Sequence, residues 1–169
     1  MCQTQVTYLG YVVTRSGIEP DPKKIEAVRS WPVPLNVQEL RSFVGLCSYY
    51  RRFVRDFAKM AKPLHSLTQK NASFKWTEEC QEAVAKLKEH LSQSPVLIYP
   101  DSSSEFILDT DASHLAIGAV LSQMVDGKEH PVAYFSRTLN QPEQQYCITR
   151  KELLAVVQSI EHFHPYLYG

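Results

Sequence analysis

The sequence predicts a mixed α/β (α+β) fold, in which a helical first part precedes a second part of strands and a final helix. Capping residues stand before apolar stripes of helical period between about residues 21 and 91. Beyond residue 95 the pattern changes to short runs rich in strand-forming residues, two of which flank the turn signal Asp126-Gly127. A last helical stripe follows from about 146 to 163.

The first part is expected to open with one extended segment, Thr7–Val13, an arm of a hairpin closed by a turn at Ser16-Gly17. Three longer helices should follow, each beginning at a capping signal: Asp21-Pro22, Asn36 with Glu39, and Thr77. They are expected to end near Ser30, Arg55 and Leu91. The break after the first falls at Trp31–Pro34.

A short helix through Met60–Leu67, with Pro63 near its first turn, leads to the polar stretch Thr68–Ser73, where we place the domain boundary. The helix that follows should bury one apolar face, made of Ala83, Val84, Leu87 and Leu91.

Four strands are predicted in the second part: Val96–Tyr99, Glu105–Asp111, Ala116–Val125 and Pro131–Arg137. The stretch Asn140–Pro142 introduces the final helix.

The net charge of zero hides a difference between the two parts. Residues 1–72 contain 11 Lys and Arg against 5 Asp and Glu, whereas residues 73–169 contain 7 against 13. A basic part suits binding of a polyanion, and an acidic part suits binding of a metal. The alternative is an ordinary solvated surface with a chance asymmetry.

No apolar run reaches membrane-spanning length, so no transmembrane helix and no membrane partner are expected. The N-terminus lacks the basic and apolar regions of a signal peptide, which favours an intracellular location. The cysteines, Cys2, Cys47, Cys80 and Cys147, are scattered and indicate reduced thiols.

Two carboxylates are the candidates for chemistry. Asp111 ends a predicted strand, and Glu152 falls among apolar residues of the last helical stripe, so that it should face inward. A buried carboxylate needs a cation, a metal or a raised pKa, which favours a shared metal site. As an alternative, Thr149 and Glu152 form a capping box, and a lone Asp at a strand end is often a turn residue. Asp109 is a secondary candidate.

A second candidate is one face of the helix predicted from Asn36 to about Arg55. Arg41, Gly45, Tyr49 and Arg52 fall within about 80° of one another on this face, opposite an apolar half. Glycine inside a helix lowers its stability, which makes sense where another backbone approaches closely. Either a nucleic-acid groove or a neighbouring helix fits that description.

Six segments carry a family resemblance. Three are similar to the start of the ribonuclease H domain of gypsy-type LTR retrotransposon reverse transcriptases: Phe106–Gln123 (FILDTDASHLAIGAVLSQ), Pro131–Leu139 (PVAYFSRTL) and Tyr146–Val156 (YCITRKELLAV). Three upstream segments resemble the primer grip, thumb and linker of the same Pol polyprotein: Tyr8–Gly17 (YLGYVVTRSG), Leu40–Phe53 (LRSFVGLCSYYRRF) and Phe57–Leu67 (FAKMAKPLHSL).

The resemblance implies three regions: the end of a palm or primer-grip-like hairpin (1–20), a helical thumb-like region (21–72), and a linker helix with the N-terminal part of a ribonuclease H-like βββα domain (73–169). It implies that Leu9, Gly10, Tyr11 and the Arg41 helix face contact a template–primer duplex or RNA–DNA hybrid. The rest of the Pol polyprotein is the implied protein partner, and the implied location is the cytoplasm, a virus-like particle or the nucleus.

The resemblance also implies a two-metal Mg²⁺ site that hydrolyses the RNA of RNA–DNA hybrids, in which Asp111 and Glu152 match the first two of four acids. The remaining two would lie beyond Gly169, and the paired aspartates of the polymerase are absent from this chain. The chain alone is therefore expected to be inactive as a polymerase and as a nuclease. Two alternatives stay open, a nucleic-acid-binding module without catalysis and a structural remnant of a retroelement.

Overall fold

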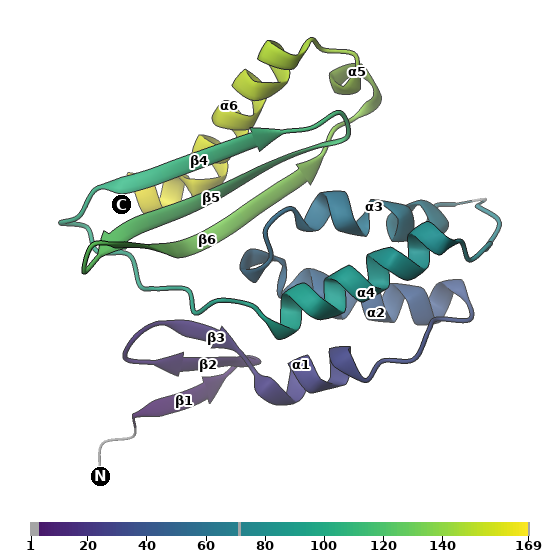
Figure 1. The fold of residues 1–169 in the computed structure, drawn as a ribbon, viewed down its shortest axis with the longest axis horizontal. Coiled ribbons are helices and arrows are strands. Elements are labelled where there is room, and N and C mark those ends of the chain that lie inside the picture. Colours follow the sequence, from purple (N-terminus) through teal and green to yellow (C-terminus); the bar gives the residue numbers. More distant parts are fainter. Residues whose placement is uncertain (1–3, 71, 169) are drawn as a thin grey trace.

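A computed structural model describes residues 4–70 and 72–168, which form two bodies side by side (Figure 1). The first body combines a small sheet with four helices. The second is an antiparallel sheet covered on one face by the long C-terminal helix. Among the described residues, no helix has both the length and the apolar character needed to cross a membrane.

The first sheet contains three antiparallel strands in the order β1 (Gln5–Tyr8), β2 (Tyr11–Thr14) and β3 (Ile18–Pro20). The prediction of one extended segment over Thr7–Val13 was wrong. Leu9 and Gly10, with φ of 47° and 76°, fold the chain back into a tight turn between β1 and β2. The predicted turn at Ser16-Gly17 is confirmed, since the Thr14 amide donates to the Gly17 carbonyl at 2.9 Å.

The predicted helix starts are confirmed for α1 (Pro22–Arg29), α2 (Val37–Tyr49) and α4 (Glu78–Ser92). The side chain of Asn36, for example, accepts a hydrogen bond from the Glu39 amide at 2.9 Å. The predicted end of α2 near Arg55 was wrong. The helix stops at Tyr49 and continues as a 3₁₀ turn, η1 (Arg51–Phe53), after which Val54 is extended and Asp56 adopts a left-handed conformation with φ of 56°.

Helix α3 (Phe57–Leu67) begins earlier than predicted and holds Pro63 in its interior rather than in its first turn. Helices α1 to α4 share one apolar core, in which α4 buries Cys80 and the four residues predicted from its periodicity. Although the proposed boundary at residue 73 groups α4 with the second body, its apolar face packs in the core of the first.

The second sheet has the order β4 (Phe106–Ala112), β5 (Ala116–Val125) and β6 (Lys128–Thr138), all antiparallel. The predicted turn between β5 and β6 is confirmed by φ of 50° at Asp126 and 73° at Gly127. The predicted strand Val96–Tyr99 was wrong. Of this segment, Leu97 forms an isolated bridge with Ile18, and the Ile98 amide donates to the Pro131 carbonyl, so the segment ties both sheets together.

A short helix, α5 (Gln141–Gln144), begins with a capping box at Asn140 and precedes α6 (Ile148–Leu167). Helix α6 buries Lys151, Ala155, Ser159 and Phe163. The opposite face of the sheet meets the first body, because the Ala58 amide at the start of α3 donates to Ser136 Oγ on β6 at 3.0 Å. The sheet therefore lies between α6 and α3 (Figure 1).

Candidate nucleic-acid interface and carboxylates

The turn between β1 and β2 is held by two tyrosines at the end of α2. The Tyr50 hydroxyl donates to the Gly10 carbonyl at 2.8 Å, and the Tyr49 hydroxyl donates to the Leu9 carbonyl. The Tyr11 ring stacks on that of Tyr49, with centroids 5.2 Å apart. The sequence-predicted residues Leu9, Gly10, Tyr11 and Tyr49 are thus brought together, although they come from distant segments.

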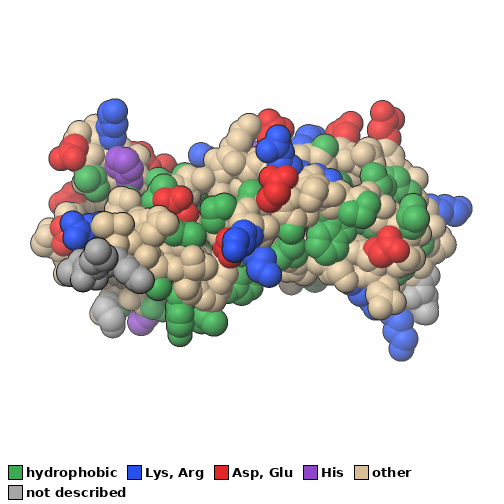
Figure 2. Space-filling view, turned by 90° about the horizontal axis from the view of Figure 1, so that it is seen from below, with side chains coloured by type: hydrophobic (Ala, Val, Ile, Leu, Met, Phe, Trp, Pro, Cys, Tyr) green, Lys and Arg blue, Asp and Glu red, His purple; other side chains and the backbone are tan. Residues whose placement is uncertain are grey.

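Burial raises the pKa of Tyr50 to about 12 and, with the neighbouring Tyr49, also raises the pKa of Tyr11 to about 12. Both phenols therefore stay protonated at neutral pH, so each can donate a hydrogen bond. The turn itself is left facing solvent, where the Leu9 side chain is 68% exposed. Figure 2 views the molecule from the side of β1–β3 and α1, and shows hydrophobic side chains among charged ones on this surface.

The exposed face of α2 carries two of the other predicted residues. Arg41 is exposed, and its Nη2 donates to the Thr68 carbonyl at 3.0 Å. Gly45 faces open space, since a Cβ built there would meet no atom within 4 Å. The alternative that Gly45 accommodates a neighbouring helix of this chain is therefore wrong for the described residues. The face is free for a partner from outside.

Arg52 does not share this face, contrary to its predicted position. It lies on η1 after α2 has ended, and its Nη2 donates to the Tyr166 hydroxyl of α6 at 3.1 Å. The helix angles that grouped Arg52 with Arg41 apply only within a continuous helix. Arg52 connects the two bodies, and its predicted contact with nucleic acid stays a prediction.

Asp109 and Asp111 lie on the same side of β4, as strand alternation requires, and both are exposed. This side faces α3. Asp111 pairs with Gly118 of β5, and a Cβ at Gly118 would come within 2.7 Å of Asp56 Oδ1. A small hollow here is lined by Arg55, Asp56, Asp109 and Asp111 together with residues of β5.

Glu152 is exposed, so the expectation that it faces inward was wrong. The buried stripe of α6 runs through Lys151, Ala155, Ser159 and Phe163, which places its centre one residue before Glu152. The capping-box alternative was wrong as well. Cys147 is the N-cap of α6, and Thr149 already lies inside the helix.

Helix α6 passes over the end of β4, where Ala112 packs in one cluster with Leu154 and Ala155 (Figure 1). This contact brings the segments of Asp111 and Glu152 to the same end of the sheet. That the two carboxylates share a metal stays a prediction. In the described part of the chain, no group of three or more His, Cys, Asp or Glu is placed to hold a metal.

The sequence reasoning missed Lys151, which is 95% buried beside the carboxylate end of the sheet. Its Nζ lies 3.4 Å from His114 Nδ1, in the loop that follows Asp111. The signal was available, because Lys151 precedes Ala155 and Ser159 at helical spacing, but lysine at such a position usually extends to solvent. On the same helix, the His162 ring stacks on Phe135, with ring centroids 4.4 Å apart.

A family model described as "RNase H-like domain found in reverse transcriptase" matches residues 76–169. Over 98% of its length, the chain is 45% identical to the Pol polyprotein of transposon 412 and 43% identical to that of transposon opus, both from Drosophila melanogaster. It is 37% identical over the same share to the Tf2-3 polyprotein of Schizosaccharomyces pombe. The chain spans only 12% to 18% of the length of these relatives.

The fold is similar to that of foamy viral protease–reverse transcriptase. One solved structure, in complex with double-stranded DNA, matches 100% of this chain and 30% of its own with a TM-score of 0.85 and 24% identity. Another, in complex with an RNA/DNA hybrid, matches 99% of this chain and 23% of its own with a TM-score of 0.83. At this level of identity, the similarity supports the fold.

Proposed function

This chain belongs to the family of RNase H-like domains found in reverse transcriptase, and we propose that it binds a nucleic-acid duplex. Its sequence relatives are Pol polyproteins of retrotransposons, and the proposed protein partner is the rest of such a polyprotein. The proposed ligand is a template–primer duplex or RNA–DNA hybrid, the class of nucleic acid bound in the related viral structures. The proposed location of the protein is intracellular.

One observation supports this proposal most strongly: a turn and a helix face, both open to solvent, are fixed to each other. The Tyr49 and Tyr50 hydroxyls hold the turn at Leu9-Gly10, while Gly45 leaves the same helix without a side chain. Arg41 adds a cation on the exposed side of that helix. A rigid surface of this kind suits contact with phosphates and groove shape rather than with particular bases.

Replacing Arg41 with alanine should weaken binding of RNA–DNA hybrid and reduce the slope of log affinity against log salt by about one unit. The slope changes because one phosphate contact, with its released counterion, is lost. Fluorescence anisotropy of a labelled hybrid at several salt concentrations measures both quantities.

Lys128→Ala is the matched control, since Lys128 is an exposed cation at the start of β6 in the acidic part. The slope of log affinity against log salt for Lys128→Ala should equal that of the unmodified chain. If Arg41→Ala and Lys128→Ala change binding equally, the proposed surface is not the one that contacts the duplex.

The proposal extends to hydrolysis of RNA in the hybrid, to which this chain would contribute part of a site. Asp111 and Glu152 offer the carboxylate oxygens that Mg²⁺ prefers, and both are open to solvent at one end of the sheet. Bound metal in such sites activates water and stabilises the leaving oxygen. Two carboxylates supply only some of the ligands of such a metal site, so the site is proposed to need further ligands.

The chain alone should therefore release no fragments from the RNA of a hybrid in the presence of Mg²⁺. Gel electrophoresis of end-labelled RNA after incubation measures this, and the Asp111→Asn variant is the control. Metal-dependent cleavage that disappears in Asp111→Asn would refute the incomplete site. Absence of cleavage together with intact hybrid binding is expected both of the incomplete site and of the alternative, a nucleic-acid-binding module without catalysis.

A further inference from the structure

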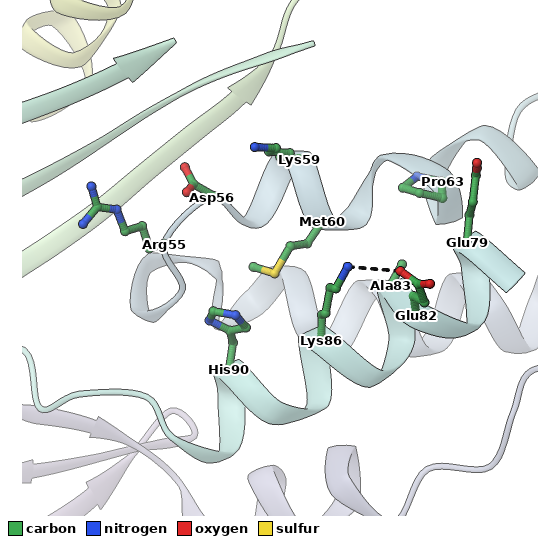
Figure 3. Close-up of a pocket in the computed structure, with 10 residues that line it drawn as sticks. All are labelled: Arg55, Asp56, Lys59, Met60, Pro63, Glu79, Glu82, Ala83, Lys86 and His90. Carbon is green, nitrogen blue, oxygen red and sulfur yellow. Dashed lines mark hydrogen bonds and ion pairs between the residues drawn. The ribbon is translucent and has the colours of Figure 1, made fainter. Parts of the chain in front are cut away.

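A groove between α3 and α4 forms a cavity of about 460 Å³ on the first body (Figure 3). Its apolar lining comes from Met60 and Pro63 of α3 and from Ala83 of α4. Figure 3 shows the Met60 side chain reaching into the space between the two helices. Neither Arg41 nor Gly45 lines this groove, so it is separate from the surface proposed to bind the duplex.

The charges around the groove are divided between its ends. Arg55, Lys86 and His90 surround Met60 at one end, where Asp56 and Lys59 also line the groove, whereas Glu79 and Glu82 lie toward the other end (Figure 3). Apolar side chains next to two cations, Arg55 and Lys86, are a suitable environment for a ligand that joins an apolar ring to an anion.

The cations at this end are available to a ligand. Lys86 Nζ lies 3.2 Å from Glu82 Oε2, but both side chains are more than half exposed, and such pairs contribute little stability. Arg55 forms no ion pair with any residue that the structure describes. The nearby Asp56 carboxylate lies against the backbone at Gly118 on β5 instead.

We propose that this groove binds a nucleoside phosphate, either a free nucleotide or one unit of a single-stranded nucleic acid. Arg55 presents the planar fork that suits a phosphate, and Lys86 and His90 add donors beside it. The base lies over Met60, Pro63 and Ala83.

Binding of AMP to the full chain, followed by isothermal titration calorimetry at low salt, tests the proposal. The double variant Arg55→Ala/Lys86→Ala should bind AMP roughly tenfold more weakly, because charge-assisted contacts to the phosphate are lost. These side chains are exposed, so the fold should tolerate their removal. Lys24→Ala on α1, another exposed cation, is the matched control and should bind AMP like the unmodified chain.

Four further ligands make the result specific. Adenosine and inorganic phosphate should each bind at least several-fold more weakly than AMP, and Met60→Ala should lower the affinity for AMP but not for phosphate. A single-stranded oligoadenylate that binds much tighter than AMP identifies the strand as the source of the ligand, and equal affinities identify the free nucleotide. Equal binding of AMP and adenosine, or of AMP and an oligoglutamate peptide, would overturn the proposal.

Discussion

Gly17→Ala is expected to lower the free energy of unfolding by about 3 kcal/mol or more. Gly17 has a φ of +150°, and a Cβ there would lie 2.2 Å from the carbonyl oxygen of Leu97. The clash is with backbone, so rotating a side chain cannot relieve it. Relief requires breaking the bridge in which Ile18 and Leu97 exchange hydrogen bonds of 2.8 and 3.0 Å.

Urea denaturation followed by the fluorescence of Trp31 and Trp76, both packed against the core of the first body, measures this loss. Gly127→Ala is the control. Gly127 also has a positive φ, of 73°, but a Cβ there meets no atom within 4 Å. Its cost should therefore be limited to backbone strain of about 1 to 2 kcal/mol. Similar losses in the two variants would contradict the close approach of β3 to Leu97.

Phe163→Ala should also be costly, with a loss of about 3 to 5 kcal/mol. The Phe163 side chain is fully buried between α6 and the second sheet, where its ring lies 6.3 Å from those of both Phe135 and Tyr166. Removing the ring leaves a cavity that the sheet cannot close without moving α6.

Leu153→Ala serves as the comparison on the same helix, because the Leu153 side chain is 63% exposed. Its effect on the free energy of unfolding should stay within about 0.5 kcal/mol. If Phe163→Ala and Leu153→Ala lower the free energy of unfolding equally little, α6 does not cover the sheet in the way described.

Local signals in the sequence were sufficient for most elements. A side chain that caps a helix acts within three residues of its start, so Asp21, Asn36 and Thr77 indicated three starts correctly. Asp126 and Gly127 likewise need only their own backbone preferences to form a turn. The resemblance to a retrotransposon Pol polyprotein agrees with the matched family and relatives.

The errors come from tertiary contacts that periodicity does not contain. Helix α2 ends at Tyr49 although Tyr50, Phe53 and Val54, all buried, would lie on one side of a continuous helix; the extended Val54 and the left-handed Asp56 turn the chain into α3 instead. This change separated Arg52 from Arg41. The outward position of Glu152 depends on which stripe of α6 meets the sheet, and buried Lys151 shifted that stripe. Val96–Tyr99 had the composition of a strand, but it crosses between the two sheets and forms only an isolated bridge, between Leu97 and Ile18, instead of a strand of either sheet.

The most direct test of the account is the affinity of the Gly45→Leu variant for RNA–DNA hybrid, measured with its stability. No atom of the described chain opposes a side chain at Gly45, so leucine in this helix should raise the free energy of unfolding by up to about 1 kcal/mol. The same side chain should block close approach of a duplex. The account predicts that the Gly45→Leu chain is at least as stable as the original and binds hybrid at least tenfold more weakly. The affinity of Gly45→Ala for hybrid should lie between those of the original and of Gly45→Leu. A stable Gly45→Leu chain that binds hybrid like the original would contradict it.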